Sequence, residues 1–193
     1  PAGVKSRSCV FLGGDYGVRN SSNEGVKGWG RRNRNGAIRA RDEAAAGGAP
    51  ELDYVAGVPD SGVPSAMGYA FEGGIPYADG IVKNRYVGRT FIEPTQAMRQ
   101  LGIRLKLNPL RSVIEGKRLV VIDDSIVRGN TSKKLVQMLR DAGAAEVHLR
   151  IVSPEVLWPC FYGIDTDPSA PLIAAHMDLR EMNAWIGSGS LAL

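Results

Sequence analysis

Short apolar runs, each followed by small or polar residues, predict the strands of this chain. They cover residues 52–58, 119–122 and 147–152. Such runs, rich in β-branched residues, are typical of strands that are covered on both faces of a parallel sheet. Between the last two runs, apolar residues recur at helical spacing up to Gly143, a residue type that commonly follows a helix. A strand, a helix and a strand within this length predict a βαβ unit.

The residues before the first of these strands have a different composition. Residues 12–48 are rich in Gly, Asn and Arg and lack apolar periodicity, so we interpret them as an atypical segment that is loop or disordered. Within this segment only residues 37–46 are predicted to be helical. A further helix is expected over residues 64–72, after the first strand. At 193 residues the chain suits a single α/β domain with a sizeable core.

Composition argues against a membrane protein. No apolar stretch approaches the length of a membrane span and no signal-peptide pattern opens the chain, so we expect a cytoplasmic protein without a membrane partner. The formal net charge of +4 is modest and suits an anionic small substrate as readily as nucleic acid, and we expect no nucleic-acid partner. The two histidines are isolated and show no metal-ligand spacing.

The strongest candidate chemistry lies in residues 120–132, which read VVIDDSIVRGNTS. Asp123 and Asp124 follow the second apolar run, and a small, hydroxyl-rich turn then opens a helix. Backbone N–H groups and the dipole at a helix N-terminus favour an anion, while adjacent carboxylates suit sugar hydroxyls or Mg²⁺. A sugar phosphate would use both features. The alternative is that Thr131 or Ser132 only caps the helix and the two acids lie in a solvated turn.

Two further stretches contain candidate binding residues. The first strand ends in residues 59–62, Pro-Asp-Ser-Gly, which form either a tight loop whose backbone approaches pyrophosphate oxygens or an ordinary turn before a helix. The stretch KNRYVGRT begins at Lys83, and no strong periodicity follows it until about residue 108. Its cations would usually form a solvated surface, but a loop of this length is often functional.

Together these motifs resemble glutamine phosphoribosylpyrophosphate amidotransferases. Residues 120–132 look like the phosphoribosyl pyrophosphate signature of type I phosphoribosyltransferases. Three further stretches resemble the amidotransferase family and occur in the same order as in that family: residues 57–70, 74–110 and 158–166. The similarity extends from about residue 52 to about residue 192. The resemblance implies an α/β, type I phosphoribosyltransferase-like fold: a mainly parallel sheet, flanking helices and a flexible antiparallel flap between Lys83 and Leu107.

The same resemblance implies a reaction in which ammonia displaces pyrophosphate from phosphoribosyl pyrophosphate. The product, 5-phosphoribosylamine, opens de novo purine biosynthesis. By resemblance, Asp123 and Asp124 hold the ribose hydroxyls and Mg²⁺. In a catalytic loop that closes over the substrate, Lys83 and Arg89 would reach the pyrophosphate, and Tyr86 would shape the path of ammonia. The other implied substrate-binding residues are Asp60, Ser61 and Gly62 at the pyrophosphate, and Ser125, Arg128, Gly129, Asn130, Thr131 and Ser132 around the 5′-phosphate.

Departures from the family limit the implied cofactors and partners. Cys9 and Cys160 match positions that hold iron–sulfur ligands in one subclass, but a cluster needs four thiolates, so we expect free thiols and no cluster. The family's glutaminase domain begins with a cysteine, whereas this chain begins with Pro1. We therefore expect the synthase half alone, with ammonia from a glutaminase domain or subunit outside this chain. Purine nucleotides as feedback inhibitors and a homo-oligomeric state are also implied.

Two other functions remain open at this point. The chain could be a non-catalytic module that binds phosphoribosyl pyrophosphate or a nucleotide for regulation, although a sensor has little use for a closing cationic loop. It could instead transfer the phosphoribosyl group to a purine base, although the sequence shows no obvious segment that would stack on a base.

One position of the predicted pyrophosphate loop departs from some relatives. Those relatives have a hydroxyl residue where this chain has Gly62, so Ser61 is the nearer hydroxyl here.

Overall fold

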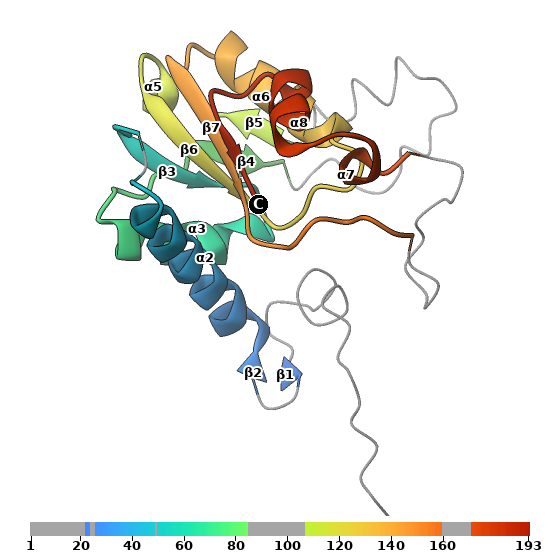
Figure 1. Cartoon of the computed structure of the whole chain (residues 1–193). Helices are drawn as coiled ribbons and strands as arrows, with labels where there is room; N and C mark the ends of the chain where they lie inside the picture. The colour runs from blue at the N-terminus through green and yellow to red at the C-terminus, as the bar shows by residue number, and fades with distance from the viewer. Residues whose placement is uncertain (1–21, 24–25, 49, 85–106, 160–170) are drawn as a thin grey trace, which may run out of the picture.

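The computed structural model describes residues 22–23, 26–48, 50–84, 107–159 and 171–193 (Figure 1). Tyr86, Arg89, Cys9 and Cys160 therefore lie outside the described residues. The elements, in chain order, are β1 (Ser22–Asn23), β2 (Val26–Lys27), α2 (Gly28–Ala45), β3 (Tyr54–Gly57), α3 (Gly62–Gly73), β4 (Ile81–Lys83), β5 (Leu107–Pro109), α5 (Arg111–Ile114), β6 (Arg118–Asp123), α6 (Asn130–Asp141), β7 (Glu146–Ile151), α7 (Ile173–His176), α8 (Leu179–Ile186) and β8 (Leu191–Ala192).

A four-stranded parallel sheet forms the centre of the described structure. Its strand order is β3-β6-β7-β8, and each neighbouring pair is parallel. The three apolar runs supply β3, β6 and β7, as predicted, and α6 connects the last two as the helix of the βαβ unit. Because all four strands run in one direction, their carboxyl ends meet at one edge of the sheet.

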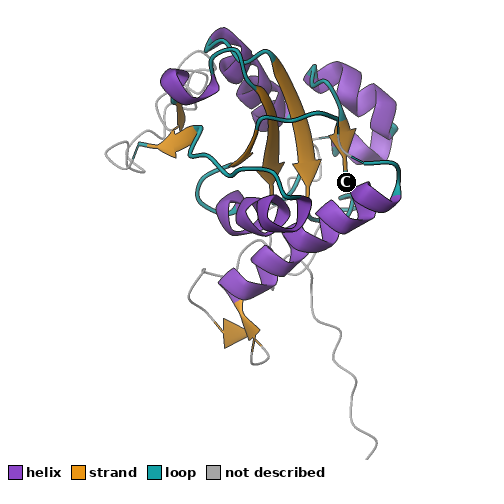
Figure 2. Ribbon diagram, turned by 90° about the vertical axis from the view of Figure 1, so that its left-hand side faces the viewer, coloured by secondary structure: helices purple, strands orange, loops and turns teal. Residues whose placement is uncertain are grey.

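Helices cover both faces of this sheet (Figure 2). On β6, Leu119 and Val121 belong to the core formed with α6 and α8, whereas Val120 and Ile122 belong to the core formed with α2 and α3. All four side chains are at most 1% exposed. The run lacks polar alternation because neither face of the strand meets water. The predicted α/β architecture, a mainly parallel sheet flanked by helices, is confirmed.

The described part of the amino-terminal segment corrects one prediction. Residues 12–48 were expected to be loop or disordered apart from a helix over residues 37–46, but α2 begins at Gly28. The first half of α2 contains three glycines and two asparagines, and both residue types have low helix propensity. Tertiary contact with α3 therefore decides the conformation. Residues 12–21 and 24–25 lie outside the described residues.

The contact between α2 and α3 is a close crossing at two glycines. A β-carbon on Gly36 of α2 would overlap the carbonyl oxygen of Ser65, and one on Gly68 of α3 would overlap the carbonyl oxygen of Asn33. The Ser65 hydroxyl donates a hydrogen bond to the Arg32 carbonyl oxygen at 2.9 Å. The two helix backbones thus touch directly, and each glycine leaves the room that the other helix occupies.

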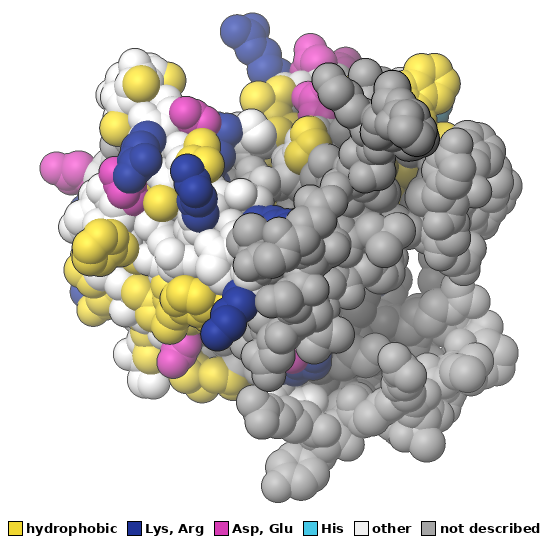
Figure 3. Space-filling view, turned by 90° about the horizontal axis from the view of Figure 1, so that it is seen from below, with side chains coloured by type: hydrophobic (Ala, Val, Ile, Leu, Met, Phe, Trp, Pro, Cys, Tyr) yellow, Lys and Arg dark blue, Asp and Glu magenta, His cyan; other side chains and the backbone are white. Residues whose placement is uncertain are grey.

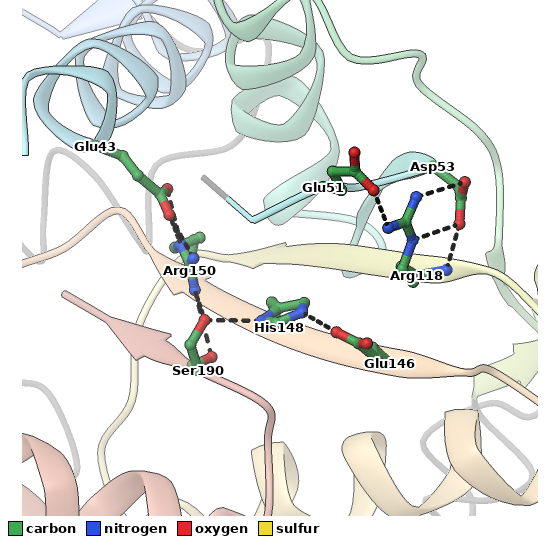
Figure 4. A network of polar contacts seen from close by, with 8 residues as sticks. All are labelled: Glu43, Glu51, Asp53, Arg118, Glu146, His148, Arg150 and Ser190. Carbon is green, nitrogen blue, oxygen red and sulfur yellow. Dashed lines mark hydrogen bonds and ion pairs between the residues drawn. The ribbon is translucent and has the colours of Figure 1, made fainter. Parts of the chain in front are cut away.

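A buried polar network connects these helices to the sheet, and Figure 4 shows the part of it that links Glu43 of α2 to Arg150, Ser190 and His148. Arg150 of β7 is 2% exposed, and its guanidinium donates to both carboxylate oxygens of Glu43 on α2, with an Nε–Oε2 distance of 2.8 Å. The Tyr69 hydroxyl of α3 donates to Glu43 Oε2 at 2.6 Å. Arg150 Nη1 also donates to Ser190 Oγ at 2.9 Å, and His148 Nδ1 lies 2.8 Å from the same hydroxyl. The network joins α2, α3, β7 and the approach to β8.

Replacing Glu43 by glutamine is expected to destabilise the fold in a pH-dependent way. Burial raises the pKa of Glu43, but hydrogen bonds from Arg150 and Tyr69 outweigh it and hold the pKa below its ordinary value of 4.5. The ionised pair therefore stabilises the fold above about pH 4.5, and this contribution is lost as pH falls through the lower folded-state pKa. At pH 7, Glu43→Gln should lower the free energy of unfolding by about 3 kcal/mol, because Arg150 loses its buried partner.

Urea unfolding of both proteins between pH 7 and pH 3 measures this effect. The difference from wild type should shrink as pH falls below 4.5, because the unfolded wild-type chain takes up a proton at Glu43 first and the folded protein follows at its lower pKa. Glu155→Gln, at an exposed acid, is the matched control and should change little. A difference that stays constant over the whole pH range would contradict the assigned ion pair.

The outer surface of the helical layer exposes several apolar side chains. A view from below shows them beside scattered basic and acidic side chains (Figure 3). On α3, Met67 and Phe71 follow one another by one helical turn and are 40% and 89% exposed. Within the described residues, no helix is both long enough and apolar enough to span a bilayer.

Candidate functional site

Two adjacent carboxylates stand at the carboxyl end of β6. Asp123 is the last residue of the strand and is 7% exposed, and its Oδ1 accepts the Asp124 backbone N–H at 2.9 Å. Asp124 is half-buried, and its own Oδ1 accepts the Ser125 backbone N–H at 2.9 Å. These short-range hydrogen bonds fix both carboxylates at the start of the loop that leads to α6. Asp124 keeps the more accessible carboxylate of the two.

The loop ends in a left-handed turn that opens α6. Gly129 is the N-cap residue, with φ of +73°, and no side chain of the described residues caps this helix end. The alternative in which Thr131 or Ser132 serves as N-cap is therefore wrong. Asn130 and Thr131 are exposed, while Ser132 is 3% exposed. A helix N-terminus without a side-chain cap presents backbone N–H groups that can bind an anion.

The loop between β3 and α3 lies directly beside the two aspartates. The Val58 N–H donates to the Ile122 carbonyl oxygen at 2.9 Å, one residue before Asp123. A β-carbon on Gly62 would overlap that same Ile122 oxygen. Gly62 thus allows the loop to pack closely against β6. In the same loop, the peptide bond between Pro59 and Asp60 is cis. The predicted pyrophosphate loop and the predicted ribose-binding acids are brought together.

Lys83 also reaches this region. It ends β4, which pairs antiparallel with β5 so that Lys83 is opposite Leu107, at the base of the predicted flap. Its Nζ lies 2.8 Å from Asp60 Oδ2, and the two side chains are 44% and 43% exposed. An exposed ion pair of this kind contributes at most about 1 kcal/mol. Lys83 can therefore turn from Asp60 toward an incoming anion at small cost.

The site offers oxygen ligands for a hard cation. The described residues contain no cluster of three or more His, Cys, Asp or Glu side chains that could hold a metal. Asp123 and Asp124 supply two carboxylates, which is typical of Mg²⁺ sites in which substrate phosphates and water complete the coordination. The residues present therefore fit Mg²⁺ that arrives with a phosphorylated substrate.

Residues from the carboxyl-terminal helices support the turn before α6, and sequence reasoning missed them. The Ile173 N–H donates to the Val127 carbonyl oxygen at 3.0 Å. A β-carbon on Gly129 would lie 2.7 Å from Cδ1 of Ile173 and 2.8 Å from Cζ3 of Trp185. Neither residue lies in a motif. Only the helical spacing of apolar residues near the carboxyl terminus could have indicated that this segment packs on the sheet.

Comparison with known proteins gives consistent matches. The family model described as "Phosphoribosyl transferase domain" matches residues 37–153. An amidophosphoribosyltransferase of Synechococcus elongatus is 63% identical over 142 residues, which are 74% of this chain and 29% of that protein. The amidophosphoribosyltransferase of Bacillus subtilis is 49% identical over 188 residues, which are 97% of this chain and 38% of that protein.

Solved structures show the same relationship. A structure described as the allosteric regulatory enzyme of purine biosynthesis superposes with a TM-score of 0.87 at 45% identity, covering 100% of this chain and 40% of that one. The Bacillus subtilis glutamine phosphoribosylpyrophosphate amidotransferase, complexed with ADP and GMP, gives 0.84 at 47% identity, covering 95% of this chain and 39% of that one. The chain thus spans between 29% and 40% of the length of these matched proteins. The type I phosphoribosyltransferase-like fold and the likeness to amidophosphoribosyltransferases are confirmed, and the chain belongs to the phosphoribosyl transferase domain family.

Proposed function

We propose that this chain transfers the phosphoribosyl group of phosphoribosyl pyrophosphate to ammonia, releasing pyrophosphate and giving 5-phosphoribosylamine. It would act as the synthase part of an amidophosphoribosyltransferase, at the first step of de novo purine biosynthesis. The observation that carries the proposal is the position of Asp123 and Asp124 between a helix N-terminus without a side-chain cap and the loop of residues 58–61. The names of the matching relatives support the same reaction.

Each part of the substrate has a partner in this arrangement. The turn of residues 128–132 would bind the 5′-phosphate through backbone N–H groups and the hydroxyls of Thr131 and Ser132. Asp124, with the buried Asp123 behind it, would accept hydrogen bonds from the ribose hydroxyls. The backbone of residues 59–62 would lie against the pyrophosphate. These contacts hold the anomeric carbon between the leaving pyrophosphate and the approaching ammonia.

The leaving group carries growing negative charge, which the site must stabilise. Lys83 supplies one cation, and Arg89 and Tyr86, outside the described residues, are proposed to complete the closing loop. Bound Mg²⁺, held by Asp123 or Asp124 together with substrate oxygens, would neutralise part of the pyrophosphate charge. The reaction needs no protein nucleophile, so positioning and electrostatics would supply most of the acceleration.

The proposal extends to partners. Ammonia would come from a glutaminase domain or subunit. Purine nucleotides would inhibit the transfer reaction, a role supported by the Bacillus subtilis relative, which was solved in complex with ADP and GMP. Self-association into a homo-oligomer is also proposed, in the cytoplasm. The exposed Met67 and Phe71 on α3 support contact with a further polypeptide, because large apolar side chains gain by being covered.

A direct assay tests the reaction. The pure chain is mixed with phosphoribosyl pyrophosphate and Mg²⁺, ammonium is added, and pyrophosphate release is followed. Release that depends on ammonium is expected. Tight binding without release would favour the regulatory module, and release that depends on adenine, guanine or hypoxanthine would favour a purine-base phosphoribosyltransferase.

Replacing Lys83 by glutamine is expected to lower kcat/KM for phosphoribosyl pyrophosphate by about 10²-fold, because the variant loses a positive charge next to the leaving group. The unfolding midpoint should stay unchanged, since the ion pair with Asp60 is exposed. Lys117→Gln, at the amino-terminal end of β6, is the matched control and should retain full activity. Equal activities of the two variants would remove Lys83 from the mechanism.

A further inference from the structure

Trp185 of α8 packs against the turn that opens α6. Gly129, the residue in the left-handed conformation, is buried, and a β-carbon there would lie 2.8 Å from Cζ3 of the Trp185 ring. Trp185 itself is partly buried and packs against the main core. The indole ring therefore occupies the space next to the only glycine of the turn, and it limits how far that turn can move.

Two further contacts hold the ring and the turn together. The Lys133 ammonium lies 4.4 Å from the centroid of the Trp185 ring, within the range of a cation–π interaction. The Lys133 backbone N–H donates to the Gly129 carbonyl oxygen at 2.9 Å. Lys133 thus contacts the turn through its backbone and the indole through its side chain. The loop before the turn is held separately, by the hydrogen bond from the Ile173 N–H to the Val127 carbonyl oxygen.

We propose that Trp185 is a positioning residue for the phosphate-binding turn, an inference that rests on the proposed function. It does not touch the substrate in this role. It fixes Gly129 and thereby the direction of the N–H groups that open α6. Backbone donors bind an anion well only when they already converge on it, and a displacement of about 1 Å weakens such a site markedly.

The affinities for the two halves of the substrate distinguish this positioning role from a general role in stability. Ribose 5-phosphate carries the group that the turn would bind, whereas pyrophosphate would bind at residues 59–62 and Lys83. Trp185 lies beside the first of these sites. Removing the ring should therefore weaken one ligand and leave the other, while a loss of overall packing would weaken both.

The experiment is a pair of titrations on the full chain at constant Mg²⁺, one with ribose 5-phosphate and one with pyrophosphate. Trp185→Ala should bind ribose 5-phosphate about tenfold more weakly than wild type, with unchanged affinity for pyrophosphate. Trp185→Phe keeps an aromatic ring next to Gly129 and should restore the affinity to within about twofold of wild type. Trp29→Ala removes a half-exposed indole from α2 and serves as the matched control.

The outcomes distinguish the two proposals. If wild type binds both ligands and Trp185→Ala binds them as wild type does, the positioning role is wrong and the proposed function stands. If Trp185→Ala loses affinity for both ligands equally, Trp185 serves stability alone and the inference is overturned. If wild type binds neither ligand, the proposed function itself fails.

Discussion

Asp124→Asn is expected to lower ammonia-dependent pyrophosphate release by about 10²-fold, which corresponds to about 3 kcal/mol of lost transition-state stabilisation. The carboxylate of Asp124 can accept hydrogen bonds from two ribose hydroxyls, and it carries the charge that a cation needs. Asparagine keeps one accepting oxygen but loses the charge. Hydrogen bonds to a charged group are worth about 1.5–3 kcal/mol each, so the loss of charge dominates the effect.

The fold should not change in this variant. The structural contact of Asp124 is the hydrogen bond that its Oδ1 accepts from the Ser125 N–H, and the Oδ1 of asparagine can accept the same bond. The unfolding midpoint should therefore equal that of wild type while the rate falls. Asp42→Asn, at an exposed acid on α2, controls for the loss of one negative charge. Turnover at the wild-type rate in Asp124→Asn would remove the carboxylate from the mechanism.

Gly68→Val is expected to destabilise the fold strongly. The first carbon of any side chain at this position would overlap the carbonyl oxygen of Asn33, so α2 and α3 would have to separate. That separation would break the hydrogen bond between Ser65 and the Arg32 carbonyl oxygen and would expose the core that Tyr69 fills. The expected loss is about 3 kcal/mol or more in the free energy of unfolding.

Urea unfolding with a far-UV circular dichroism signal measures this loss. Gly30→Ala is the matched control, because Gly30 also lies in a helix and a β-carbon there would meet none of the described residues within 4 Å. That substitution should stabilise the chain by about 1 kcal/mol through the higher helix propensity of alanine. If Gly68→Val were as stable as wild type, the helix crossing would not be as close as described.

The sheet could be predicted from the sequence because its strands are buried on both faces. The run at 119–122 was apolar for that reason, whereas the run at 147–152 alternates apolar residues with His148 and Arg150, whose buried side chains make polar contacts. Both strands formed where expected. The first half of α2 could not be predicted in this way. Its conformation depends on a contact between Gly36 and Ser65, and a residue without a side chain leaves no hydrophobic signal.

Part of the candidate site could likewise be predicted from the sequence and part could not. Asp123, Asp124 and the turn before α6 are contiguous in the chain, so one motif contained them. The nearness of Lys83 to Asp60 followed only from the resemblance to a family, and the structure shows the pair in contact. Trp185 packs on Gly129 across more than fifty positions of sequence. No local spacing encodes such a contact, because it arises only when α8 docks on α6.

The pairing of β4 with β5 has a practical consequence for engineering. Since Lys83 lies opposite Leu107, the two residues that flank the stretch between β4 and β5 are neighbours in space. These two neighbouring points are therefore convenient junctions for exchanging the intervening residues between homologous proteins. Such chimaeras would assign loop-dependent differences in rate among these proteins to the cassette or to its host.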